Sequence, residues 1–233
     1  MIKRRTFLML GFILFLFNLF IFGALAVPKS FHIKAETTIY GASEKANINI
    51  ETWFASNKSR VEMKGNAGAN NPGMGSSVII ADLNQKVAYL LDPAGKTGLK
   101  LDLNQLNANN FLSGSINEYV MNPEKTEAEI KKQGGKKVGT ESILGYSCEI
   151  WQLNAPKALY TKQNQGKDVV IKMWLSKELG LVLKIEMKSA SKGVIMDFHV
   201  KNIQTNITVP TNLFTVPSGY KIAPLIPPPN KPK

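Results

Sequence analysis

The chain has 233 residues, with 29 Lys and Arg against 17 Asp and Glu and a formal net charge of +12. Hydrophobic residues make up 44% and charged residues 20%, a globular composition that excludes disorder, collagen and coiled coil for most of the chain. The single cysteine excludes an intramolecular disulfide framework and a Cys-rich zinc ribbon, and the two histidines leave little for a metal site or a catalytic histidine network.

The N-terminal segment is typical of an export signal. A basic head at residues 3–5 precedes an apolar run over 7–22, and the small residues Ala24 and Ala26 follow it. These are the three parts of a secretory signal peptide, so we expect cleavage after Ala26. The alternative is a retained anchor, because residues 6–27 would span about 33 Å as a helix, just enough to cross a bilayer.

The charge that remains after cleavage points to an anionic surface as a partner. Removal of residues 1–26 leaves 26 basic against 17 acidic residues, a net charge of +9. Phospholipid head groups and other envelope polyanions would attract such a protein. Nucleic acid is not expected, because the chain is exported and its lysines are scattered. We therefore expect a periplasmic or cell-envelope protein, with membrane anchoring by the N-terminal segment as the alternative, and a solvated basic face explains the charge equally well.

Period-two alternation predicts antiparallel strands through most of the chain. Phe31, Ile33 and Ala35 alternate with polar neighbours, and Thr37 and Ile39 continue the same apolar phase. This period is typical of a strand with one buried face. Such strands are expected at 31–40, 47–54, 60–64, 77–82, 86–92, 146–153, 168–176, 181–187 and 194–203.

The middle of the chain has a different pattern. Alternation stops between residues 103 and 135, and a weak helix signal covers 103–112. Pro123 suits the first turn of a second helix, Glu127 can pair with Lys131 one turn later, and Gly134 would end it. The proline-rich residues 223–233 are expected to form a loose tail.

These elements predict a mainly β fold. A single open sheet of this size must curl and cover its apolar face. We expect a curved antiparallel sheet, a half-barrel of roughly ten strands, with the short helical insert covering the concave face. The predicted organisation is a signal peptide or anchor at 1–26, the half-barrel domain at 27–222 and the tail at 223–233.

Several stretches, in this order, resemble the LolA/LolB-like lipoprotein-carrier superfamily of envelope proteins. They comprise a basic Arg-containing strand, a strand ending in Asp, a strand with an aromatic residue, a hairpin with a Leu-x-Leu-Lys strand, and a Phe-x-x-Pro-x-Gly element. These stretches are residues 53–63, 78–82, 89–92, 173–184 and 212–220. The Gly-Tyr-x-Cys stretch within 139–148 is similar to an uncharacterised exported branch of the same group.

The resemblance implies a half-barrel wrapped over helices, with an apolar cavity that receives acyl chains. It differs from the well-studied carriers at its start, because a strand pattern begins at Phe31, where those carriers begin with a helix that helps form the lid. The function expected is non-enzymatic binding of lipid or an acylated ligand such as a lipoprotein. The alternative is a regulatory or sensor domain of the same fold that binds a protein partner, whose identity the sequence does not indicate.

Apolar strand positions are the candidates for the ligand-binding face. They are Ile33, Ile50, Phe54, Met63, Ile80, Tyr89, Ile150, Leu183, Ile185, Met196 and Phe198. Arg60 could hold a head group through its planar fork, with an exposed strand arginine as the alternative. Cys148 is expected to be a buried inert thiol, and His32 and His199 surface residues. No catalytic residue, cofactor or metal site is expected, and a closed core filled by the insert remains the alternative to an open pocket.

Processing of the N-terminus is the first testable prediction. Because a basic head, an apolar run and the Ala24–Ala26 exit occur together, protein from the native host should begin at Val27. N-terminal sequencing measures this directly. An intact Met1 terminus in the membrane fraction would instead support the retained anchor.

Overall fold

A computed structural model describes residues 28–40, 45–65, 76–104, 123–154 and 169–225. Twelve strands form one sheet in the order β12-β6-β5-β4-β3-β2-β1-β11-β10-β9-β8-β7. The strands are β1 (Ser30–Tyr40), β2 (Lys45–Ala55), β3 (Lys58–Gly65), β4 (Ser77–Asp82), β5 (Val87–Asp92), β6 (Thr97–Asp102), β7 (Lys136–Ile143), β8 (Tyr146–Asn154), β9 (Val169–Ser176), β10 (Leu181–Ser189), β11 (Gly193–Thr205) and β12 (Lys221–Pro224). Helix α4 (Pro123–Lys132) and the 3-10 turn η2 (Thr211–Phe214) complete the described elements.

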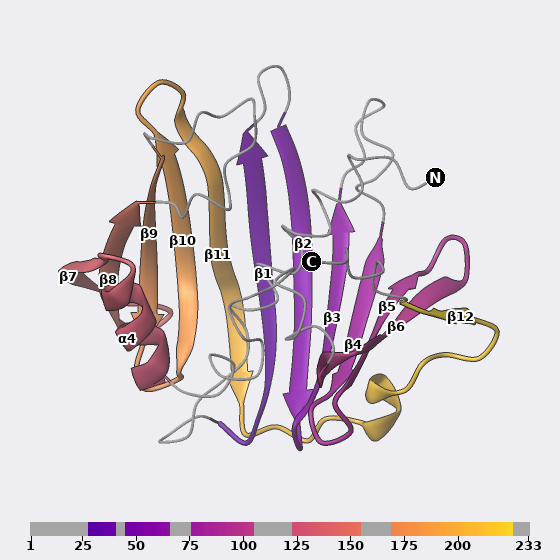
Figure 1. Ribbon diagram of the computed structural model, residues 1–233. Coiled ribbons are helices and arrows are strands. Elements are labelled where there is room, and N and C mark those ends of the chain that lie inside the picture. The colour runs from indigo at the N-terminus through magenta and orange to yellow at the C-terminus, as the bar shows by residue number, and fades with distance from the viewer. Residues whose placement is uncertain (1–27, 41–44, 66–75, 105–122, 155–168, 226–233) are drawn as a thin grey trace, which may run out of the picture.

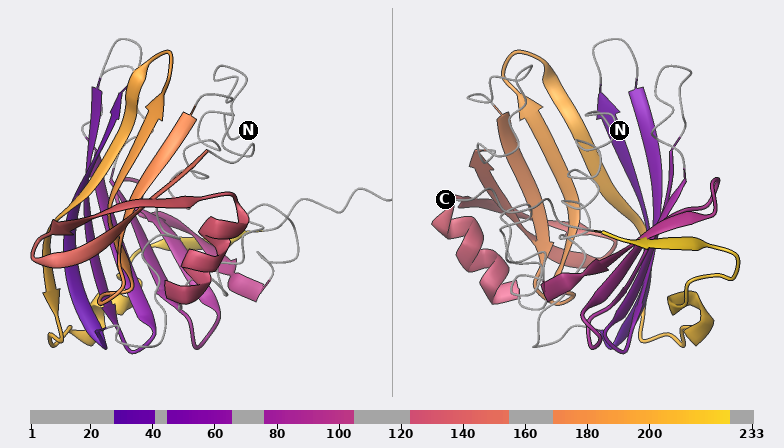
Figure 2. Two further views of the ribbon diagram at one scale, coloured as in Figure 1. Left: turned by 90° about the vertical axis from the view of Figure 1, so that its left-hand side faces the viewer. Right: turned by 45° about the vertical axis from the view of Figure 1, so that its right-hand side comes forward.

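The predicted fold class is confirmed. Neighbouring strands run antiparallel, except that β12 lies parallel to β6. The sheet is open, with β7 at one edge and β12 at the other. It is strongly bent, and helix α4 lies on its concave side beside β7–β9 (Figures 1 and 2).

The alternation seen in the sequence sets which residues face the concave side. β1 is central, and it pairs with β2 through Phe31 opposite Phe54 and with β11 through Thr37 opposite Phe198. The rings of Phe31 and Phe54 stack with centroids 5.2 Å apart. Both residues belong to a single buried cluster that extends from β6 to β8, so one continuous apolar face holds the sheet together.

A smaller apolar cluster lies on the opposite, outer face. Val78, Ile80 and Leu91 are buried there, and Val216 and Tyr220 from the C-terminal segment pack against them. β4 is therefore covered on both sides, which explains why its sequence is a continuous apolar run rather than an alternating one.

Helix α4 occupies the predicted position, and the sequence explains the burial of Ile130 and the end of the helix. Ile130 is buried in the main cluster. Gly134, with a φ of +80°, ends the helix, and the Gly135 amide donates to the Ile130 carbonyl at 2.8 Å. A Cβ at Gly135 would meet the side chain of Ile130, so the close approach requires glycine. The residues at 105–112 of the weaker helix candidate lie outside the described residues.

Three strands were not predicted, and each has a weak alternation signal. β7 is an edge strand with mostly exposed residues, and β6 is short and contains Gly98. β12 is fully exposed and ends in Pro224, a residue that only an edge strand accommodates. Ala223 and Pro224 pair with β6, so the sheet continues through residue 224. The tail expected from residue 223 therefore begins after residue 224.

The sidedness of β10 gives the second testable prediction. Leu183, Ile185 and Met187 are buried as expected, whereas Lys188 is exposed and Lys184 is half-buried over the ring of Trp174. Leu183→Ala should lower the free energy of unfolding by about 2–5 kcal/mol, because it leaves a cavity at a fully buried site.

Chemical denaturation with Lys188→Ala as the matched control on the same strand measures this effect. The control should stay within about 0.5 kcal/mol of wild type, because its side chain is exposed. A Leu183→Ala midpoint equal to that of wild type would exclude packing of β10 into the core.

Candidate functional site

The concave apolar face is the candidate site. It is built from alternate residues of neighbouring strands, whose register lines up in rows across the sheet. One row contains Thr37, Phe198, Ile185 and Met173, from β1, β11, β10 and β9. Because each strand turns every second side chain to this side, the rows form a continuous apolar surface.

The structure brings most of the predicted residues together on this face. Those in its buried cluster are Ile33, Ile50, Phe54, Met63, Leu183, Ile185, Met196 and Phe198. All eight are at most 6% exposed. These eight side chains are therefore closed off from solvent in this structure.

Three predicted residues lie elsewhere. Ile80 and Tyr89 pair with each other and belong to the outer-face cluster, not to the concave face. Alternation could not assign them, because β4 and β5 are apolar on both faces. Ile150 is half-buried opposite Trp174 and packs at the margin of the main cluster.

Arg60 lies on the outer face, away from the concave side. It stands opposite Trp53 and Ile80 in the sheet register. Its Nε lies 2.8 Å from a carboxylate oxygen of Glu62, and its Nη1 donates to the Leu213 carbonyl at 3.1 Å. The guanidinium therefore ties the C-terminal segment to β3, a contact that the head-group hypothesis did not anticipate.

Sequence reasoning did not single out the hydroxyl groups on the concave face. Thr37, Thr52 and Ser59 are buried there, and their hydroxyl oxygens have no hydrogen-bond partner. A signal for the two threonines was present, because both occupy the apolar phase of their strands. A polar residue at an apolar position of the alternation places a polar atom on the buried face, where burial without a hydrogen bond costs free energy.

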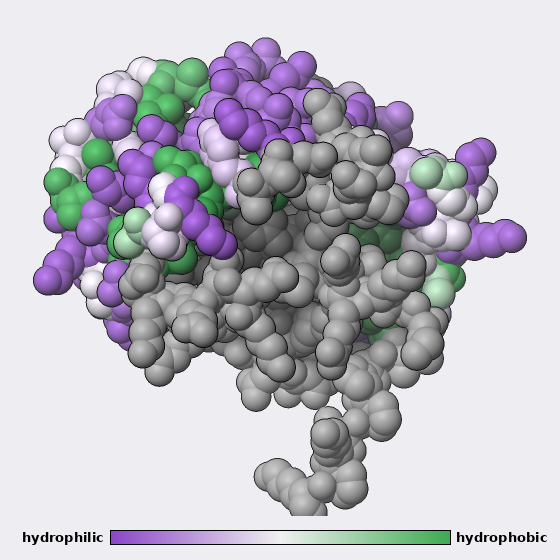
Figure 3. Space-filling model, turned by 90° about the horizontal axis from the view of Figure 1, so that it is seen from above, coloured by the Kyte–Doolittle hydropathy of each residue, from purple (hydrophilic) through white to green (hydrophobic). Residues whose placement is uncertain are grey.

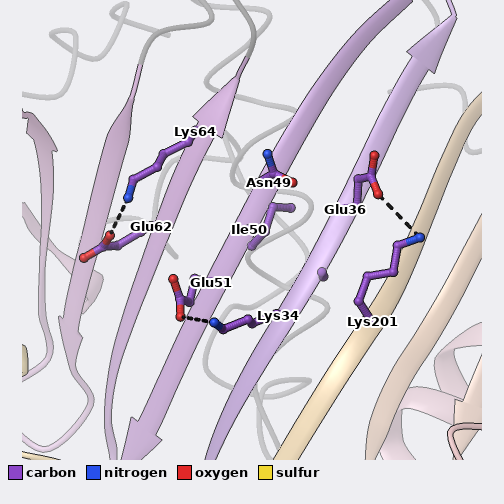
Figure 4. Close-up of a pocket in the computed structure, with 9 residues that line it drawn as sticks. Lys34, Glu36, Asn49, Ile50, Glu51, Glu62, Lys64 and Lys201 are labelled. Carbon is purple, nitrogen blue, oxygen red and sulfur yellow. Dashed lines mark ion pairs between the residues drawn. The ribbon is translucent and has the colours of Figure 1, made fainter.

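On the outer face, lysine and glutamate side chains of neighbouring strands form ion pairs. Around a shallow groove of about 280 Å³, Lys34 pairs with Glu51 at 3.5 Å, and the other ion pairs are Lys64–Glu62 and Lys201–Glu36 (Figure 4). Hydrophilic residues also dominate this side of the molecule, at the top of Figure 3. Because each lysine has a glutamate partner, this groove offers no excess charge for an anionic ligand.

Both histidines lie on the outer face beside carboxylates. His32 stacks on Trp53 and lies 2.7 Å from an oxygen of Glu51. Burial, followed by the charge of Lys201, lowers the pKa of His199 despite the nearby acidic groups. Among the described residues, no group of three or more histidine, cysteine or acidic side chains is placed to hold a metal ion.

Cys148 is a buried thiol, as predicted. Its side chain is fully inaccessible, and burial raises its pKa to about 11. Since the thiolate is the reactive form, this cysteine is inert at neutral pH.

A chain of ion pairs fastens helix α4 to the end of the sheet. Lys177, in the turn between β9 and β10, lies 3.0 Å from Glu127 of the helix and 3.2 Å from Glu149 of β8. Lys131 lies 2.7 Å from the other oxygen of Glu127. The hydrogen bonds from Lys131 and Lys177 lower the pKa of Glu127. Burial alone would raise the pKa of Glu149, but hydrogen bonds from Lys137 and Lys177 lower it.

Sequence comparison assigns the chain to a family. The model described as "Domain of unknown function (DUF4412)" matches residues 36–194. The chain belongs to this family. No curated protein matches its sequence. The match starts within β1 and ends within β11, so the family's shared region contains the central strands of the sheet.

Several solved structures are similar to this chain at low sequence identity. An uncharacterized conserved protein from Thermus thermophilus has a TM-score of 0.51 and 6% identity, over 86% of this chain and 91% of that one. The LolA superfamily protein NE2245 from Nitrosomonas europaea has a TM-score of 0.34 and 12% identity, over 81% and 90%. MucB, in the Pseudomonas aeruginosa MucA/MucB complex, has a TM-score of 0.44 and 11% identity, over 80% and 55%, so this chain spans about half its length.

The likeness to the Thermus protein, at 6% identity, concerns the fold alone. The mainly β fold class expected from the sequence is confirmed, as a large, open, mostly antiparallel sheet with very little helix in the described part of the chain. Within the described ranges, no helix is long and apolar enough to cross a membrane, and the N-terminal residues 1–27 lie outside those ranges.

The ion-pair chain at α4 gives the third testable prediction. Because the folded pKa values of Glu127 and Glu149 are lowered, their stabilisation is complete above the ordinary value of 4.5 and is lost as the pH falls through the lowered values. Lys177→Met should lower the free energy of unfolding at pH 7 by about 0.5–1 kcal/mol and have less effect at pH 3.

Urea denaturation at the two pH values measures the difference. Lys188→Met, which removes the single 3.0 Å ion pair with Glu186, is the matched control and should change stability less. A Lys177→Met effect of equal size at both pH values would show that packing, and not charge, is what the lysine contributes.

Proposed function

We propose that this protein is an exported, non-enzymatic carrier or receptor that binds lipid or an acylated ligand on its concave apolar face. The observation that supports the proposal is the face itself, a continuous apolar surface on one side of a strongly curved sheet. Burial of an acyl chain against it would contribute about 0.8 kcal/mol per methylene group. Most of the binding energy would come from desolvation of the acyl chain, and binding of this kind requires no catalytic group.

Binding requires the closed face to open. Helix α4 is the described helix that packs on the concave side, through Ile130 and through Lys131, whose Nζ lies 5.6 Å from the ring centre of Trp151. Among the described contacts, the Lys177 ion-pair chain also holds the helix, and water and salt can replace part of this attraction. Movement of α4 away from β8 would expose Trp151 and the neighbouring apolar residues to a ligand.

The place of action proposed is the cell envelope, after export directed by residues 1–26. The net charge of +9 expected for the mature chain favours approach to an anionic membrane surface. Because the lysines around the outer groove are paired with glutamates, this attraction would be weak, diffuse and sensitive to salt. A weak surface attraction suits a protein that must also leave the membrane.

A protein-binding regulatory domain remains the second candidate. The observation that favours it is the edge strand β7, whose outer side has no neighbouring strand in the described sheet. Val138 and Leu144, on β7 and in the turn after it, are 51% and 46% exposed, and apolar groups occur on that side of the molecule in Figure 3. An exposed edge with apolar side chains suits the addition of a strand from a partner.

Saturable binding of a fluorescent acyl probe is the fourth testable prediction. Wild-type mature protein should bind the probe, and Ile185→Glu should abolish binding, because a charge at the wall opposes the buried chain. If the face opens to a ligand, this variant should keep its β-sheet circular dichroism. Lys188→Glu, on the exposed side of the same strand, is the matched control and should bind normally.

Two outcomes would contradict the proposal. Unfolding of Ile185→Glu would indicate a closed core in which an unpaired carboxylate is buried. The absence of saturable probe binding by the wild type would exclude lipid carriage and make the protein-binding domain the better account.

A further inference from the structure

The inference concerns the unpartnered hydroxyl groups of the concave face and rests on the proposed function. The exposed fractions of Thr37, Thr52 and Ser59 are 0%, 1% and 5%, and in the part of the chain that the structure describes none of the three hydroxyl oxygens has a hydrogen-bond partner. Buried polar atoms in folded proteins are nearly always hydrogen-bonded. Three such atoms on one face therefore indicate a missing partner.

The neighbouring side chains cannot supply that partner. Thr52 stands between Ile33 and Val61 in the register, and Ser59 stands between Phe54 and Ala81. All four neighbours are apolar, and each hydroxyl can donate one hydrogen bond. Among the described residues the sheet neighbours offer no side-chain acceptor, and with no charged side chain at these register positions a neutral oxygen of a ligand would fit best.

The spacing of the hydroxyls separates them into a pair and a single group. Ser59 lies two residues from Val61, the register partner of Thr52, so the two residues are diagonal neighbours about 7–8 Å apart. Thr37 lies four residues beyond Ile33, the other partner of Thr52, which places it about 13 Å away along the strand. One compact polar group can therefore contact Thr52 and Ser59, but not Thr37 as well.

The position of the pair also gives the ligand a direction. Ser59 lies close to the exposed β2–β3 turn at Ser56 and Asn57, whereas Thr37 lies toward the other end of these strands, opposite Phe198 in the register. A ligand with its polar end at this turn would extend its acyl chains from Thr52 toward Phe198 over apolar side chains.

We infer that Thr52 and Ser59 are the polar anchor of the site and donate hydrogen bonds to the ester carbonyl oxygens of a diacylglycerol-type lipid. Two neighbouring ester carbonyls on a glycerol unit match two neighbouring donors. An ionised fatty acid is a poorer match, because its carboxylate would be buried without a cation. The hydroxyls thus select a neutral ester over a free acid or a plain hydrocarbon.

The test compares ester and ether forms of one lipid. Dioctanoylglycerol and its dioctyl ether analogue have the same chains, but only the ester has carbonyl acceptors. Displacement of the fluorescent acyl probe should show that wild-type protein prefers the ester, and Thr52→Val or Ser59→Ala should each reduce ester affinity about three- to tenfold. Affinity for the ether should not change.

Stability provides a second readout. Thr52→Val replaces an unsatisfied buried hydroxyl by a methyl group of the same shape, so the melting temperature of the unliganded protein should rise by about 2–4 °C. Thr37→Val is the matched control, because its hydroxyl is equally buried and unpartnered but distant from the pair. It should also raise the melting temperature, yet leave the ester preference intact.

The outcomes separate this inference from the proposed function. Equal wild-type affinity for ester and ether would overturn the hydroxyl anchor while lipid binding stands. A Thr37→Val effect on ester preference as large as that of Thr52→Val would overturn the assignment of the pair. If wild-type protein binds neither lipid, both the anchor and lipid binding are wrong.

Discussion

Burial of one face of a single sheet is the constraint on which the rest of this structure depends. Twelve strands share one layer, and this layer bends strongly around its apolar face (Figure 2). Phe31 and Phe198, on neighbouring strands in the middle of the sheet, are fully inaccessible on that face. The curvature that stabilises the fold also creates the concave surface on which a long apolar ligand would lie.

The outer face of the sheet differs from the concave face in its charged side chains. Its central strands carry alternating lysines and glutamates, which keep that surface soluble without adding net charge. Over β4 and β5 it is apolar, and there the C-terminal segment packs against Ile80 while Arg60 holds its backbone at Leu213. The same segment continues into β12, so one stretch of chain both seals the outer cluster and pairs with the edge of the sheet.

The concave face combines a large apolar area with a few polar atoms that the protein leaves unsatisfied. A core selected for stability alone would have valine at Thr37 and Thr52, because valine has the same shape and no hydroxyl to desolvate. Under the proposed function, the hydroxyls would lower the stability of the unliganded protein and would be recognised by a ligand. A cost of this kind is expected where a surface serves binding as well as folding.

The sequence by itself determined the strands with clean alternation, the helix at 123–132 and the buried state of Cys148, because period and turn chemistry are local properties. It could not assign Ile80 or Tyr89 to a face of the sheet, because a strand that is apolar on both faces shows no alternation. The edge strand β7 was not predicted, because without a buried face its sequence shows little alternation. Only the tertiary structure decided that Arg60 points away from the concave side and that Thr52 and Ser59 become neighbours, because strand register joins residues that the sequence separates.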